Sequence, residues 1–186
     1  DSVERPAPVM PILRPPNPAL TCHNTTDIGI TTTSALKGLC RRRHNPFHLV
    51  KHANLCLTRT RCAVQNQTLG HRGRKHDPLY RSRRLLTKAR ERLTDQGHEK
   101  LRGLLAAGDP DGHVATAWAA KAAVRDIYTQ PSQTATEYLT ELSADLRQPH
   151  RHEHVRALGK TLHNWASEIL AWHTTRTSNG PTEGQN

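Results

Sequence analysis

The apolar residues between positions 152 and 173 recur at the spacing of an α-helix, and this pattern constrains the fold most strongly. They step along the sequence by three and four positions: Val155, Leu158, Leu162, Trp165, Ile169 and Trp172. Such a run gathers its side chains into one seam, which other helices have to cover. Packing inside a helical bundle is the simpler interpretation of one helix over 152–173, and a homo-oligomer held together by the seam is the alternative.

The segment from residue 46 to the seam carries further helical signals and almost no strand signals. Asn45-Pro46 and Asp77-Pro78 each combine an N-cap residue with a proline at the first helical position. Further helices are predicted at 97–107 and 133–146, and a longer helix between them follows a turn at 109–112. The predicted apolar faces are Phe47, Val50, Leu57 and Val64 with Leu49, Ala53 and Cys56; Leu79, Leu86, Ala89 and Leu93; Val114, Trp118, Ala122 and Val124; and Tyr138, Leu139, Leu142 and Leu146. A mainly α fold follows, with its second helix reaching Leu93.

Residues 1–44 differ from the rest of the chain. Six of the twelve prolines lie between positions 6 and 18, and threonine-rich stretches follow them. No helical or strand period runs through this segment, so we expect an irregular or disordered leader.

The chain is strongly basic, with 27 lysines and arginines against 16 acidic residues and a pI near 10.2. Such an excess favours polyanionic partners, and nucleic acid is the commonest of them. The densest basic run is the candidate DNA-binding surface: Arg72, Arg74, Lys75, Arg81, Arg83, Arg84 and Lys88, continued by Arg90 and Arg92. A basic helix that is merely solvated is the alternative for this run.

The four cysteines and 13 histidines do not form a recognisable metal motif. No Cys-x-x-Cys pair occurs, and neither the histidines at 44–52 nor the His-Arg-His-Glu-His run at 150–154 matches the zinc motif His-Glu-x-x-His. No secretory signal and no apolar run of membrane-spanning length is visible. We therefore expect reduced thiols, a cytoplasmic location and no membrane partner.

Four sequence strings, taken in order, resemble a known family. They are NPFHLVKHAN, VQNQTLGHRGRKHDPLYRSRRLLTKARERL, LLAAGDPDGHVATAWAAKAAVRDIY and SNGPTEGQN, and they span about residues 45–186. In content and order they resemble bacterial insertion-sequence transposases of the ISL3 type, which are DDE enzymes. The resemblance implies DNA transposition, with the ends of an insertion sequence as the DNA partner.

The resemblance also implies a catalytic domain with a ribonuclease-H-like fold, in which three carboxylates hold two Mg²⁺ ions for phosphoryl transfer on DNA. A helical insertion separates the second and third acids of this fold. Glu183 matches the third acid and is the implied metal ligand, whereas Asn45 stands where the family has its second Asp. Asn45 keeps the capping ability of Asp but lacks the negative charge. Asp27 is the only nearby candidate for the first acid, and its surroundings do not match the family.

The resemblance divides the chain into a leader unlike the family (1–44), a helix after the second catalytic position (45–68), a helical insertion (69–173) and the start of a helix bearing Glu183 (174–186). A frameshift before Asn45 would explain the leader, and a helix that starts at Pro181 indicates truncation. We therefore expect an inactive remnant with an incomplete catalytic core. The alternatives are a non-enzymatic nucleic-acid-binding protein, an oligomerising helical module, and a chain that does not fold stably.

Overall fold

The computed structural model describes residues 46–175, and this part of the chain consists of α-helices, two short 3-10 helices and the loops between them. The α-helices are α1 (Pro46–Leu69), α2 (Pro78–Thr87), α3 (Asp95–Gly108), α4 (His113–Asp126), α5 (Ser132–Leu146), α6 (Glu153–Asn164) and α7 (Ala166–Thr175). The 3-10 helices are η1 (Arg90–Arg92) and η2 (Ile127–Thr129). Within these residues no strand occurs, which confirms the mainly α prediction.

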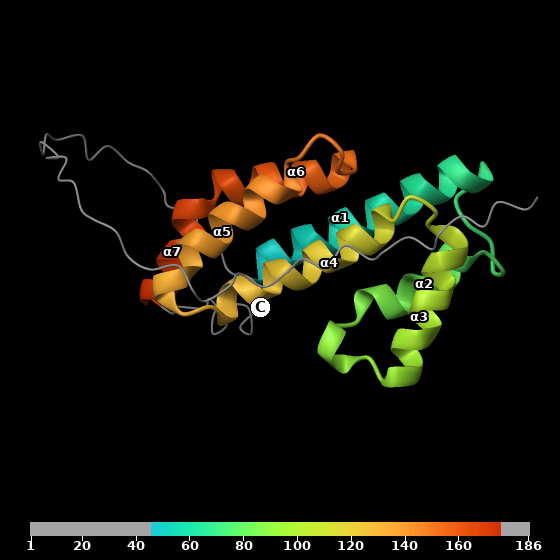
Figure 1. The fold of residues 1–186 in the computed structure, drawn as a ribbon, viewed down its shortest axis with the longest axis horizontal. Helices are drawn as coiled ribbons and strands as arrows, with labels where there is room; N and C mark the ends of the chain where they lie inside the picture. Colours follow the sequence, from blue (N-terminus) through green and yellow to red (C-terminus); the bar gives the residue numbers. More distant parts are fainter. Residues whose placement is uncertain (1–45, 176–186) are drawn as a thin grey trace, which may run out of the picture.

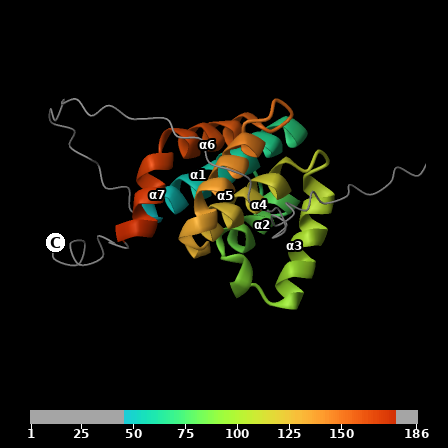
Figure 2. The ribbon, with the colours of Figure 1, turned by 60° about the vertical axis from the view of Figure 1, so that its left-hand side comes forward.

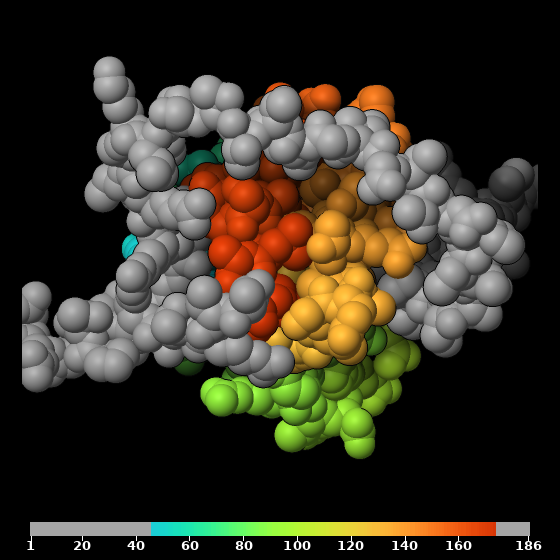
Figure 3. Space-filling view, turned by 90° about the vertical axis from the view of Figure 1, so that its left-hand side faces the viewer, coloured from blue at the N-terminus to red at the C-terminus, as the bar shows by residue number. Residues whose placement is uncertain are grey.

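The long helix α1 is the centre of the arrangement (Figure 1). It packs along α4, which runs in the opposite direction, and α6 covers another side of it. Helices α2 and α3 form a pair at one end of α1, and α7 lies towards the other end. Figure 2 shows that the α2–α3 pair projects to one side of the other helices. Helices α5 and α7 lie side by side at the opposite end, as the space-filling view shows (Figure 3).

The buried residues form one core that joins all the α-helices. Leucine, valine and alanine supply most of it, as expected for a chain with few aromatic residues. The fully buried residues include Leu49, Leu79, Leu101, Val114, Leu139, Leu146, Leu162 and Ile169. The seam of the last two helices is part of this core, since Val155, Leu158, Leu162 and Ile169 are buried. Intramolecular packing therefore covers most of the seam.

The apolar face of α1 differs from the predicted one. Phe47 is 59% exposed, and the buried face consists of Leu49, Ala53, Cys56, Leu57, Thr60, Val64 and Gln65. Because successive helical residues are rotated by about 100°, Phe47 lies on the opposite side of the helix from Leu49. The prediction is confirmed for Leu49, Ala53, Cys56, Leu57 and Val64. It is wrong for the exposed Phe47 and the half-buried Val50, and it missed Thr60 and Gln65 because they are polar.

The second helix ends at Thr87, six residues before the predicted limit at Leu93. The side chain of Lys121 on α4 is responsible for this end: its Nζ donates to the carbonyl oxygens of Leu86, Thr87 and Lys88 at 2.8, 2.7 and 3.1 Å. These carbonyls belong to the last turn, where a helix leaves acceptors without partners and where a cation is favoured. Lys121 is only 4% exposed, so a buried charge from a distant helix ends α2.

The predicted single helix over 152–173 is two helices. The helix α6 ends at Asn164, Trp165 leaves the helical conformation with φ −104° and ψ 14°, and α7 begins at Ala166. The indole ring of Trp165 contacts the imidazole of His52 on α1, with ring centroids 5.0 Å apart. Helix α6 packs on both α5 and α1, and α7 packs on α5.

The other predicted elements are confirmed with small shifts. Asp77 is the N-cap residue of α2, with Pro78 at the first helical position. The predicted turn at 109–112 lies between α3 and α4, where Gly112 adopts a left-handed conformation (φ +68°). Trp118 and Tyr138 are partly buried against the core, whereas Ala122 is only half-buried and Ala89 lies in the connection after α2.

Candidate nucleic-acid interface

The loop between α1 and α2, residues 70–77, is built around two side chains. Gln65 is fully buried; its Nε2 donates to Oδ2 of Asp77 at 3.2 Å, and its Oε1 accepts from Nη1 of Arg61 at 3.1 Å. The same Oδ2 of Asp77 accepts from the backbone N–H of Arg74 and lies 3.5 Å from Nδ1 of His71. One carboxylate oxygen therefore connects both ends of the loop to the last turn of α1.

Glycine is required at one position of this loop. Gly73 has φ +116°, and a Cβ atom there would lie 2.2 Å from Nε2 of Gln65. A side chain at residue 73 would thus meet both backbone strain and a steric clash. The loop conformation depends on a glycine that lets the chain pass directly over the buried amide.

This loop presents its basic side chains to solvent. Arg72, Arg74 and Lys75 are exposed, and so is the neighbouring His76. In the described part of the chain, Arg125 and Arg151 are the arginines that form ion pairs with carboxylates, and no ion pair involves these three residues. Their positive charges are therefore free to meet an anion from outside the molecule.

The predicted basic residues of α2 divide into two groups. Arg81, Arg84 and Lys88 are exposed. Arg83 is partly buried: its Nη1 donates to the carbonyl of Tyr80 at 2.8 Å, and its guanidinium lies 3.8 Å from the centroid of the Tyr80 ring. The structure thus brings the loop residues to the same end of the molecule as Arg81 and Arg84 of α2 and Lys88, its C-cap residue. It holds Arg83 in a stacked position.

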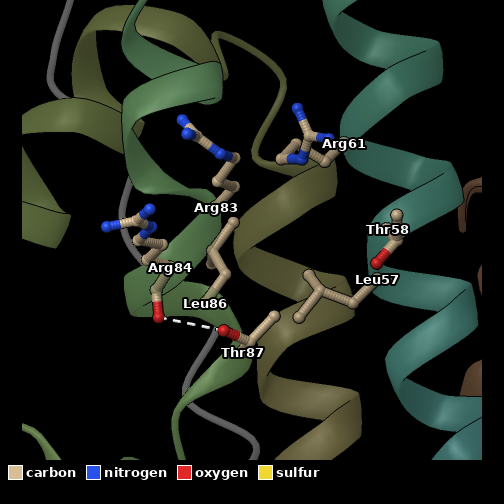
Figure 4. Close-up of a pocket in the computed structure, with 7 residues that line it drawn as sticks. All are labelled: Leu57, Thr58, Arg61, Arg83, Arg84, Leu86 and Thr87. Atoms are coloured by element: carbon tan, nitrogen blue, oxygen red, sulfur yellow. Dashed lines mark hydrogen bonds between the residues drawn. The ribbon is translucent and has the colours of Figure 1, made fainter.

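A cleft of about 260 Å³ lies between α1 and α2 (Figure 4). Leu57 and Leu86 form its apolar floor, and Arg61 and Arg83 point in the same direction at one end of it. The residues that line it are Leu57, Thr58, Arg61, Arg83, Arg84, Leu86 and Thr87. Arg61 was not among the predicted DNA-binding residues, because it lies on α1, outside the dense basic run. Its closeness to Arg83 arises only from the packing of the two helices.

The candidate catalytic positions lie outside the described residues. This applies to Asn45, to Glu183, which was expected to bind Mg²⁺, and to Asp27. Within residues 46–175 no group of three or more His, Cys, Asp or Glu side chains could hold a metal ion. Among the same residues, no helix is both long and apolar enough to span a membrane.

Comparison with known proteins identifies the family. The sequence model of the ISL3-type DDE transposases, described as transposase, matches residues 38–186. This match starts seven residues before Asn45 and includes every described helix. No curated protein and no solved structure matches the chain. Because the family match covers well over half of the sequence, the chain belongs to the ISL3-type DDE transposase family.

Proposed function

We propose that residues 69–173 form the helical insertion of a ribonuclease-H-like transposase domain and that this insertion binds the sugar–phosphate backbone of DNA. The contact surface consists of the loop 70–77 and the exposed basic side of α2. Membership of the transposase family supports a function in DNA transposition and DNA as the partner. The fixed basic loop is the observation that carries the assignment of the surface.

The loop backbone is preorganised for binding. Asp77 and Gln65 hold it in place, so little further ordering of the backbone is needed when Arg72, Arg74 and Lys75 bind phosphate groups. Each cation that neutralises a phosphate releases counterions, and the logarithm of the binding constant falls with the logarithm of salt concentration by about 0.9 per contact. Side chains that contact only phosphate contribute no sequence preference.

The salt dependence of duplex binding tests this surface. In the triple variant Arg72→Gln, Arg74→Gln and Lys75→Gln, the slope of log K against log salt should become less negative by about 2 to 3, since each lost contact removes about 0.9. A matched triple variant of exposed residues on α1 and α6, Lys51→Gln, Arg156→Gln and Lys160→Gln, keeps the same net charge change. Equal slopes for the two triple variants would mean that the loop is not the contact surface.

We further propose that Asn45 prevents this chain from cutting DNA. A neutral amide is a poor replacement for a carboxylate as a ligand of Mg²⁺, which prefers charged oxygen ligands. In the family reaction, two bound ions would activate the attacking water or 3′-hydroxyl and stabilise the leaving oxygen. Asn45 could still cap a helix at Pro46 but could not supply a charge to such an ion.

Metal binding and DNA cleavage test this second proposal separately from DNA binding. The full chain should neither nick nor join insertion-sequence ends in Mg²⁺, and calorimetry should detect no tight uptake of two ions. Asn45→Asp should raise the affinity for Mn²⁺ or Mg²⁺ by tenfold or more, with Asn66→Asp, at an exposed position of α1, as the charge-matched control. Nicking by the unchanged protein would refute the proposal, as would equal affinities in the two variants.

A further inference from the structure

Three histidines meet where α4 and α6 begin. The ring centroids of His113, the first residue of α4, and His152 lie 5.3 Å apart, and those of His152 and His154 lie 5.2 Å apart. All three side chains are partly buried. The cluster lies on α4 and α6 and belongs to neither the basic loop nor the family's catalytic positions. Imidazoles at such spacing repel one another when they are charged.

His152 has a structural task that requires the neutral form. It is the N-cap residue of α6, and its Nδ1 accepts a hydrogen bond from the backbone N–H of His154 at 3.3 Å. A protonated imidazole carries hydrogen on both nitrogens and cannot accept this bond. It would also place a positive charge at the N-terminus of a helix, where the helix dipole disfavours it. Protonation of His152 therefore removes the cap and adds a repulsion at the same point.

The surroundings of His152 act mainly against its protonation. Burial, followed by the neighbouring His154 and His113, lowers the pKa of His152 below its usual 6.5, and Arg156 acts in the same direction. Glu153 alone opposes them, and its exposed carboxylate lies 3.7 Å from Nε2 of His154. On the side of α1, the Cys56 thiol donates to the carbonyl of His154 at 3.3 Å. Burial raises the pKa of Cys56 to about 11, so this thiol keeps its proton throughout the range considered.

We propose that His113, His152 and His154 form a pH-sensitive latch, in which protonation of His152 in mildly acid solution uncaps α6 and loosens its first turns from α1 and α5, the two helices on which it packs. The latch would control how firmly α6 closes over α1. It acts on the helical insertion itself and does not depend on DNA or metal binding.

The direction of the effect follows from proton linkage. The unfolded chain takes up a proton at His152 near pH 6.5, whereas the folded chain resists it to lower pH. The contribution of His152 to stability is therefore complete above pH 6.5 and is lost as the pH falls through the lower pKa of the folded state.

Amide hydrogen exchange of the full chain between pH 7.5 and 5 tests the latch. After correction for intrinsic exchange, protection of the first turns of α6 should fall by about tenfold, which corresponds to a lost cap and an added charge. The α2–α3 pair should keep its protection. In the same sample, NMR titration of His152 should give a midpoint below 6.5.

The variant His152→Asn separates the latch from general acid sensitivity. Asn can cap a helix and does not titrate, so α6 of this variant should keep its protection at pH 5. His163→Asn, an exposed position on the same helix, is the matched control and should behave like the unchanged protein. The proposal fails if His152→Asn loses protection as steeply as the control. If His152→Asn does not fold, a midpoint at or above 6.5 for His152 in the unchanged protein also refutes it.

Discussion

Replacement of Lys121 by methionine removes the charge that ends α2 while keeping most of the buried aliphatic chain. The change leaves the carbonyls of Leu86, Thr87 and Lys88, now bound at 2.7–3.1 Å, without their common donor. A hydrogen bond to a charged group contributes about 1.5 kcal/mol or more, so the three together give about 4–5 kcal/mol. The folded state regains part of this, because it no longer has to hold a desolvated ammonium. We expect a net loss of about 2–3 kcal/mol at pH 7.

Lys121 should also make the free energy of unfolding depend on pH. The pKa of Lys121 is lowered from 10.5 to about 8, mainly by burial and also by the nearby Arg125, whereas Glu91 acts to raise it. The ammonium form therefore dominates at pH 7. Between pH 8 and 10.5 the unfolded chain binds more protons at this residue than the folded chain, so stability rises with pH over this window. This contribution is complete above 10.5 and is lost as the pH falls through 8. The deficit of Lys121→Met should accordingly grow from pH 8 to pH 10.

Urea unfolding, followed by circular dichroism at 222 nm and by tryptophan fluorescence, measures both effects. Lys160→Met, an exposed position on α6, is the matched control. Two results would refute the reasoning: a Lys121→Met midpoint within error of the control at pH 7, or a deficit that shrinks as the pH rises.

Two further predictions concern close packing. Gly159→Ala should lower the free energy of unfolding by about 1–3 kcal/mol, because its Cβ would lie 2.9 Å from side-chain atoms of Leu146 and Arg147 and 3.1 Å from the backbone nitrogen of Arg147. Gly103→Ala, with open space around it, should instead raise stability by about 0.5–1 kcal/mol, and thermal unfolding that showed the same sign for both would contradict this difference. A third prediction concerns the loop 70–77: Gln65→Met should speed tryptic cleavage within it several-fold, since the amide that holds Asp77 is gone. Gln67→Met, an exposed neighbour, should cleave at the normal rate, and equal rates in the two variants would mean that Gln65 does not fix the loop.

The family and much of the helical arrangement could be predicted from the sequence. The start of α2 was found because a proline fits the first helical position, although the Asp77 side chain makes no capping bond, and the turn at 109–112 was found from its local turn chemistry. The exposure of the basic residues at 72, 74 and 75 could be predicted because unpaired charged side chains are almost never buried. The expectations for Asn45 and Glu183 rest on sequence resemblance, and both lie outside the described residues.

Other features were decided only by tertiary contacts. The end of α2 is set by Lys121, more than 30 residues away, and no glycine or proline marks it. The break at Trp165 accompanies ring packing on His52 and likewise carries no local signal. The buried face of α1 includes Gln65, which is satisfied by Asp77 and Arg61. The physical reason is common to all three. Local sequence fixes where a helix can form, whereas its limits and its buried face depend on which distant groups satisfy its polar atoms and cover its surface.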